Sequence, residues 1–194
     1  FDPTNQIALV VTFTTPESFG CKKPDGSACK VGDTDCVCSS QVWVTAVPEV
    51  KDKCKTVTTE LNRFLNQLLG LHPNTRYTHF YTLEVKQSDI FRPAPNPDTT
   101  TKYPCPDPSQ QECGEFFPDG TSDEHKIWIG NQMLSSYIIA TPLKLDGYPW
   151  TRLGYTYNWK KGADKYGASE YVVRQGSTVT LKEIKESKDY CSAN

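Results

Sequence analysis

The sequence predicts an α+β fold: a mainly antiparallel sheet of about six strands together with two helices. Short β-branched and aromatic runs recur along all 194 residues, whereas only two stretches have helical character. The last three strand-like runs also follow one another without a helix between them, which favours antiparallel pairing. We see no internal repeat and no linker, so we expect residues 1–194 to form a single disulfide-stapled domain.

In the N-terminal half, two strands are expected to flank a loop and to precede a helix. Ile7–Phe13 and Gln41–Val47 are rich in β-branched residues, and Pro48 ends the second run. Segment 14–40 is rich in Gly, Pro, Asp, Lys and Cys without periodicity, so it predicts a cysteine-rich loop. Segment 51–71 predicts one helix, because its apolar residues share a face. They are Val57, Leu61, Phe64, Leu65 and Leu68.

The C-terminal half is expected to contain a strand, a long loop, a helix and three further strands. Tyr77–Val85 has a β-rich composition. Half of the 14 prolines fall in segment 88–120, which predicts an extended, ordered loop or lid. Thr121 and Glu124 have the spacing of a capping box, so a second helix is expected to begin there. Segment 148–185 carries the last strands, separated by Gly-containing turns.

The eight cysteines predict up to four disulfides and an oxidising compartment. Their spacing lacks the paired knuckles of structural zinc sites. A local bridge between Cys105 and Cys113 is expected, and Cys191 is expected to tie the C-terminal end to the body. Because the chain begins at Phe1 without a leader-like segment, we expect a mature secreted, extracellular protein. The cysteines are Cys21, Cys29, Cys36, Cys38, Cys54, Cys105, Cys113 and Cys191.

Charge and hydropathy exclude several classes of protein. The 21 Lys and Arg residues nearly balance the 23 Asp and Glu residues, so the strong cationic field of a nucleic-acid coat protein is not expected. The longest aliphatic run, Ile7–Val11, is far shorter than the roughly 20 residues of a membrane-spanning helix. Asp119–Glu124 could bind calcium but lacks EF-hand spacing and is more typical of a turn and helix cap. We therefore predict no membrane partner, no cofactor and no metal site.

The C-terminal strands carry the densest set of chemically useful side chains. On a strand that starts at Arg152, alternate residues form one polar face. If this strand pairs with the next, Arg152 and Glu170 could share a cleft, with Glu170 as base and Arg152 on an anionic oxygen. His125, in the first turn of the second helix, has a pKa suited to an acid near neutral pH. Together these residues would supply the acid, the base and the anion clamp that cleavage of a phosphodiester through its neighbouring hydroxyl requires.

Each of these residues also has a simpler structural interpretation. Arg152 and Glu170 could form a solvated cross-strand ion pair, which stabilises a sheet little. His125 could be an ordinary residue on the helix surface. The aromatic face of the strand is more often core than ligand platform. As a platform, it would contribute to a substrate-binding set that comprises Trp150, Tyr155, Tyr157, Asn158 and Trp159.

The block YPWTRLGYTYNW at 148–159, followed by GASEYVV at 167–173, resembles a motif of secreted microbial proteins and toxin-type C-terminal domains. The same group carries patterns similar to VWVTAVP at 42–48 and DIFRP at 89–93. This resemblance implies a shared domain rather than a reaction. More distantly, a Tyr-x-Trp strand followed by a Glu strand is similar to small secreted ribonucleases and to ADP-ribosyl-transferring toxins.

Three functions follow from these residues. The first is a toxin-like or scavenging hydrolase that cleaves a nucleic acid or nucleotide with Glu170, His125 and Arg152; the acidic pI opposes this function mildly. The second is a glycoside hydrolase acting on a cell-wall polysaccharide, with Glu170 and a second carboxylate such as Asp146 or Glu124. The third is a non-catalytic binding module.

Overall fold

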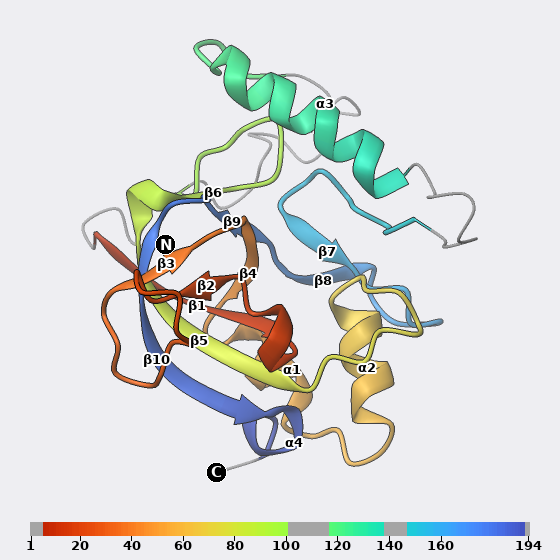
Figure 1. The fold of residues 1–194 in the computed structure, drawn as a ribbon. Helices are drawn as coiled ribbons and strands as arrows, with labels where there is room; N and C mark the ends of the chain where they lie inside the picture. Colours follow the sequence, from red (N-terminus) through yellow and green to blue (C-terminus); the bar gives the residue numbers. More distant parts are fainter. Residues whose placement is uncertain (1–5, 101–116, 138–146, 193–194) are drawn as a thin grey trace, which may run out of the picture.

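The computed structural model describes residues 6–100, 117–137 and 147–192, and it confirms a mainly antiparallel α+β fold. Within these ranges the sheet is larger than predicted, because eight strands form one curled sheet in the order β2-β3-β10-β5-β1-β4-β9-β6 (Figure 1). A separate pair, β7 (Tyr155–Tyr157) and β8 (Tyr166–Ser169), lies beside it. The bounds of the eight strands are β1 Ile7–Thr14, β2 Cys21–Lys22, β3 Cys36–Cys38, β4 Val42–Ala46, β5 His79–Lys86, β6 Ile90–Phe91, β9 Tyr171–Val173 and β10 Thr178–Glu186.

The first predicted helix is two helices in the structure. Helix α1 covers Glu49–Cys54 and α2 covers Leu61–Leu68. Between them Glu60 adopts a left-handed conformation with φ 50°, which redirects the chain before α2 begins. The other helices are α3 (Asp123–Tyr137) and the short α4 (Ser187–Tyr190). Two single 3₁₀ turns, η1 Pro16–Ser18 and η2 Gln87–Asp89, complete the described elements.

The start of α3 differs slightly from the predicted capping box. The backbone N–H of His125 donates to Ser122 Oγ at 3.2 Å, so Ser122 satisfies a first-turn donor of α3. The hydroxyl of Thr121 instead donates to the carbonyl of Pro118 at 2.7 Å. The helix was therefore predicted correctly, but its cap lies one residue later.

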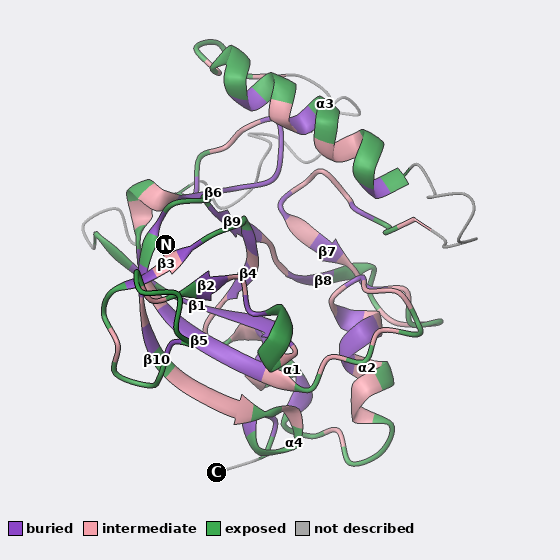
Figure 2. Ribbon diagram, viewed as in Figure 1, coloured by how far each residue is buried: buried purple, intermediate pink, exposed green. Residues whose placement is uncertain are grey.

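Both faces of the central strands are buried, as the purple segments in Figure 2 show. Successive side chains of a strand point to opposite faces, so each face builds its own apolar cluster. One cluster includes Val10, Leu83, Val85 and Leu181. The other contains Val11, Phe13 and Phe80, and it packs against residues from α1, α2 and α4: Val50, Leu65, Leu68 and Tyr190.

Three disulfides are present among the described residues. Two of them, Cys21–Cys38 and Cys29–Cys36, cross-link the segment around β2 and β3, which the sequence predicted to be loop. The third, Cys54–Cys191, confirms that Cys191 ties the C-terminal end to the body. The predicted bridge between Cys105 and Cys113 lies outside the described residues. None of the described helices combines the length and apolar character needed to cross a membrane.

The strand predicted to start at Arg152 is shorter in the structure, and its polar side chains rather than its aromatic ones are buried. Its polar residues Thr156 and Asn158 are buried, whereas Tyr155 and Tyr157 keep part of their surface exposed. Thr156 tolerates burial because its hydroxyl donates to the carbonyl of Leu68 at 2.7 Å and accepts from the N–H of Ala168 at 2.8 Å. The prediction that the aromatic face is the buried one was therefore wrong.

Candidate active site

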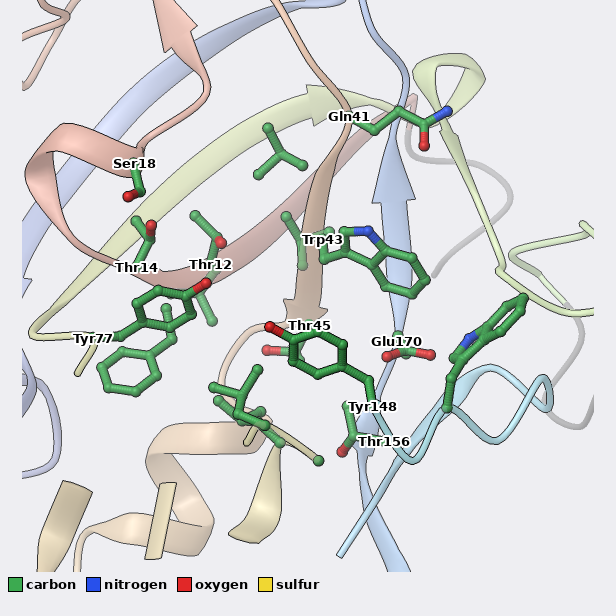
Figure 3. Close-up of a pocket in the computed structure, with 18 of the residues that line it drawn as sticks. Thr12, Thr14, Ser18, Gln41, Trp43, Thr45, Tyr77, Tyr148, Thr156 and Glu170 are labelled. Carbon is green, nitrogen blue, oxygen red and sulfur yellow. The ribbon is translucent and has the colours of Figure 1, made fainter. Parts of the chain in front are cut away.

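A cavity of about 360 Å³ lies between the sheet and the segment that precedes β7 (Figure 3). Strands β1 and β4 pair at only two positions, Val10 with Ala46 and Val11 with Thr45. Beyond these pairs the strands separate, and residues from both, including Phe13 and Trp43, line the cavity. Residues 148–150 also line the cavity, and α3 contributes Gln132 and Ser136. The cavity therefore exists because two neighbouring strands diverge.

Glu170 enters this cavity because it lies between two strands of different sheets. It follows β8 and precedes β9, and its N–H donates to the carbonyl of Gly154 at 2.9 Å. Its neighbour Ser169 is fixed by Glu49, whose Oε2 accepts from the N–H and the hydroxyl of Ser169 at 2.9 and 2.5 Å. Tyr171 pairs with Val44, so these two side chains share one face of the sheet. Their neighbours Glu170 and Thr45 therefore lie on the opposite face.

The carboxyl of Glu170 is poorly solvated. The residue retains some exposed surface, but its Oε2 atom has essentially none and no hydrogen-bond partner. Burial raises the pKa of Glu170 from 4.5 to about 8. The nearby indole N–H of Trp150 acts in the opposite direction and lowers this pKa, although it does not reach hydrogen-bond geometry with the carboxyl. At neutral pH the protonated acid therefore predominates, which is the state that a proton donor requires.

Two further buried polar atoms at the cavity lack hydrogen-bond partners. They are Thr45 Oγ1 and Trp150 Nε1, from side chains of residues that are only 7% and 8% exposed. Thr45, Trp43 and Glu170 project into the same space from β4 and from the residue before β9 (Figure 3). Buried polar groups are normally paired, so such a concentration around one cavity makes this cavity the candidate binding site.

The remaining wall is aromatic and neutral. The rings of Trp43 and Trp150 meet edge to face with centroids 6.1 Å apart. Glu170 is the only Asp, Glu, Lys, Arg or His among the described residues that line the cavity. Aromatic rings and hydroxyl or amide groups form the rest of its polar surface: Trp43, Tyr77, Tyr148, Trp150, Tyr157, Thr12, Thr14, Ser18, Ser40, Gln41, Thr45, Gln132, Ser136 and Thr156.

His125 belongs to a different, packed region. Its Nε2 bonds to the carbonyl of Ala94 at 2.7 Å, and its ring stacks on Trp128 and meets Phe91 edge to face. Since a carbonyl only accepts, Nε2 carries the proton. Burial lowers the pKa of His125, so the neutral ring is favoured. His125 does not line the cavity, and its imidazole holds α3 against the 92–99 segment.

Arg152 is also outside the cavity lining. It adopts φ 61° before β7 rather than an extended conformation, and its Nη1 contacts Met133 Sδ at 3.8 Å. The described residues contain no ion pair between Arg152 and Glu170 within 4.0 Å. The predicted acid, base and anion clamp are therefore not gathered around this cavity.

Of the predicted substrate-binding residues, Trp150 and Tyr157 line the cavity. Trp159 does not line the cavity, and its indole N–H donates to the carbonyl of Leu71 at 3.0 Å. Asn158 is buried and its Oδ1 accepts from the N–H of Lys160 at 3.1 Å. Tyr155 lies against Tyr166, at a ring-centroid distance of 4.8 Å.

The alternative second carboxylates and metal ligands can also be placed. Glu124 is exposed in the first turn of α3 and does not line the cavity, and Asp146 lies outside the described residues. Across the described ranges, which include Asp119–Glu124, no group of three or more His, Cys, Asp or Glu side chains is arranged to hold a metal ion.

Sequence reasoning missed Trp43, Thr45, Tyr77 and Tyr148 as site residues. The alternation of Trp43 and Thr45 along a strand was visible, but nothing in it indicated that this face would border a cavity. Comparisons of the chain with protein-family models, curated proteins and solved structures gave no match. Function is therefore inferred from the chemistry of the cavity.

Proposed function

We propose that this protein is a secreted hydrolase that cleaves a glycosidic bond, with Glu170 as its acid and base. The observation that carries the proposal is the Glu170 carboxyl, desolvated beside Trp150 with its pKa raised to about 8. A carboxylic acid that keeps its proton at neutral pH can protonate a departing glycosidic oxygen. Three disulfides support an extracellular location, since such bonds persist in oxidising compartments.

The reaction needs a proton donor first and a proton acceptor second. Glu170 gives its proton to the glycosidic oxygen while the bond from that oxygen to the anomeric carbon breaks, leaving an oxocarbenium-like centre. The resulting carboxylate then takes a proton from the water that attacks this carbon, so Glu170 returns to its starting state. The described lining residues include no second carboxylate, which gives both proton transfers to Glu170.

The cavity favours a glycoside over a phosphodiester. Enzymes that act on phosphates place Arg, Lys or a metal ion on the phosphate oxygens. No Lys, Arg or His is found among the described lining residues, and Arg152 contacts Met133 instead. Aromatic rings and hydroxyl groups instead suit the apolar faces and hydroxyl edges of sugars. A phosphodiester would have to enter beside a buried carboxyl without a cation.

Replacement of Glu170 tests this proposal. We expect Glu170→Gln to reduce hydrolysis of aryl glycosides and cell-wall polysaccharide by about 100-fold or more, because the amide cannot donate the proton. Glu124→Gln is the matched control, since Glu124 is an exposed carboxylate outside the cavity. Equal activity in wild type and Glu170→Gln would refute the proposal. Cleavage of RNA or DNA by wild type would support the phosphodiester hypothesis instead.

A binding module without catalysis is the second candidate function. It is favoured by the single carboxyl in the described lining, because most glycoside hydrolases use two. In that case wild type and Glu170→Gln would both bind a saccharide, and neither would release a product. The same pair of proteins therefore distinguishes the two functions.

A further inference from the structure

Three unpaired polar atoms belong to side chains of residues that line the cavity, and they come from three separate segments. Thr45 Oγ1 comes from β4, Trp150 Nε1 from the 148–150 segment, and Glu170 Oε2 from the junction of β8 and β9. Each buried polar group without a partner costs the fold about 1–3 kcal/mol. Three such groups in one cavity are readily explained by a ligand that pairs with them.

The hydrogen-bonding capacity of these atoms defines the ligand. The Trp150 indole is a donor only, the Thr45 hydroxyl can donate or accept, and the protonated Glu170 carboxyl can also do both. Their complement is a set of hydroxyl groups, which likewise donate and accept. The edge-to-face rings of Trp43 and Trp150 provide an aromatic wall for the CH faces of a ring.

Charge and size restrict the ligand further. With no cation among the described lining residues, an anionic substituent would be buried unpaired, which costs several kcal/mol. The cavity volume of about 360 Å³ is at the lower end of the usual range for small-molecule pockets. It therefore suits one or two sugar units rather than a longer chain. Tyr148, which is 49% exposed, marks the side open to solvent.

We propose that the cavity recognises an uncharged sugar unit at the end of a saccharide, and that Thr45 and Trp150 are the residues that read its hydroxyl groups. This inference rests on the proposed function in taking the cavity as the substrate site. It does not depend on whether a bond is then cleaved.

The test is calorimetric titration at neutral pH with four neutral sugars and two matched acids. The neutral probes are glucose, galactose, mannose and N-acetylglucosamine, and the acids are glucuronic and galacturonic acid. We expect at least one neutral sugar to bind, and both uronic acids to bind at least tenfold more weakly than the neutral sugar that binds most tightly. Thr45→Val and Trp150→Phe should each weaken binding by roughly three- to tenfold, since each removes one hydrogen bond. Thr178→Val, at an exposed position of β10, is the control and should leave the affinity unchanged.

Every outcome decides for or against the inference. Absence of binding by all four neutral sugars, or tighter binding of the acids, would overturn it. Equal affinity in Thr45→Val, Trp150→Phe and Thr178→Val would remove Thr45 and Trp150 from sugar recognition. Thr45→Val preserves the shape of the side chain, so it keeps the test decisive if Trp150→Phe fails to fold. Normal sugar binding without hydrolysis would contradict the proposed reaction while leaving this inference supported.

Discussion

Glu170 and His125 are both poorly solvated titratable residues, yet their surroundings differ. The imidazole of His125 donates a hydrogen bond and packs between aromatic rings, so its polar and apolar surfaces are both used within the fold. The Glu170 carboxyl has an unpaired oxygen and borders a cavity. Residue type alone suggested an acid and a base in one site. The difference shows that an unsatisfied group beside open space is the better indicator of function.

Replacement of His125 should give the largest stability effect. His125→Ala leaves the Ala94 carbonyl without its partner and a gap beside Trp128, so we expect the free energy of unfolding to fall by about 2–4 kcal/mol. Denaturant unfolding measures this change, with the half-exposed His72→Ala as control, for which less than about 0.5 kcal/mol is expected. Turnover per folded molecule should change little. A loss of turnover as large as that of Glu170→Gln would instead place His125 among the catalytic residues.

The pH dependence of stability should show the two residues acting in opposite directions. The folded state favours the protonated Glu170, so stability is lost as pH rises from about 4.5 to about 8, by at most about 1.4 kcal/mol per pH unit. The folded state favours neutral His125, so its contribution is lost as pH falls below about 6.5. Unfolding at a series of pH values measures both effects. Glu170→Gln should remove the loss at high pH, and an unchanged profile would show that Glu170 is well solvated.

Replacing Trp150 or Trp159 by Phe should give the smallest change in stability, and the two substitutions differ only in whether the indole N–H that is lost has a partner. Trp159→Phe removes an indole N–H that is bonded to Leu71, and Trp150→Phe removes one that is unpaired. The free energy of unfolding of Trp159→Phe should fall by about 1 kcal/mol because a hydrogen bond is lost. Trp150→Phe should not show this decrease, because it breaks no hydrogen bond. Thermal unfolding measures both changes. Greater destabilisation by Trp150→Phe than by Trp159→Phe would mean that the indole N–H of Trp150 is already satisfied in the free protein.

The fold class was predictable because strand alternation and helical spacing are local properties of the chain. The wrong predictions concern features that depend on contacts between residues far apart in the sequence. The buried side of β7 follows from Thr156, whose hydroxyl bonds to the carbonyl of Leu68, a residue 88 positions away. A Cβ atom at Gly167 would lie 2.1 Å from this hydroxyl, so the contact also needs a glycine there. The helix break at Glu60 was also missed, because segment 51–60 contains no Gly or Pro that would indicate it.

The site was predictable only in part for the same reason. Glu170, Trp150 and Tyr157 were found from a motif of nearby residues in the chain. Trp43 and Thr45 join them only because β4 pairs with β9 and diverges from β1, and sheet register cannot be read from one strand. His125 and Arg152 had suitable chemistry, but their hydrogen-bond partners and contacts lie elsewhere in the fold.

The strand order has a consequence for how the molecule assembles. β10 follows the other described strands in the sequence, yet it lies inside the sheet and is the link between β5 and the β2–β3 pair. During synthesis, β2 and β3 can form their two short-range cross-links early, but they have no strand to dock on until β10 has been made. The Cys54–Cys191 bond joins residues 137 positions apart, so it forms after β10 has been made and fixes the segment that follows β10 to α1.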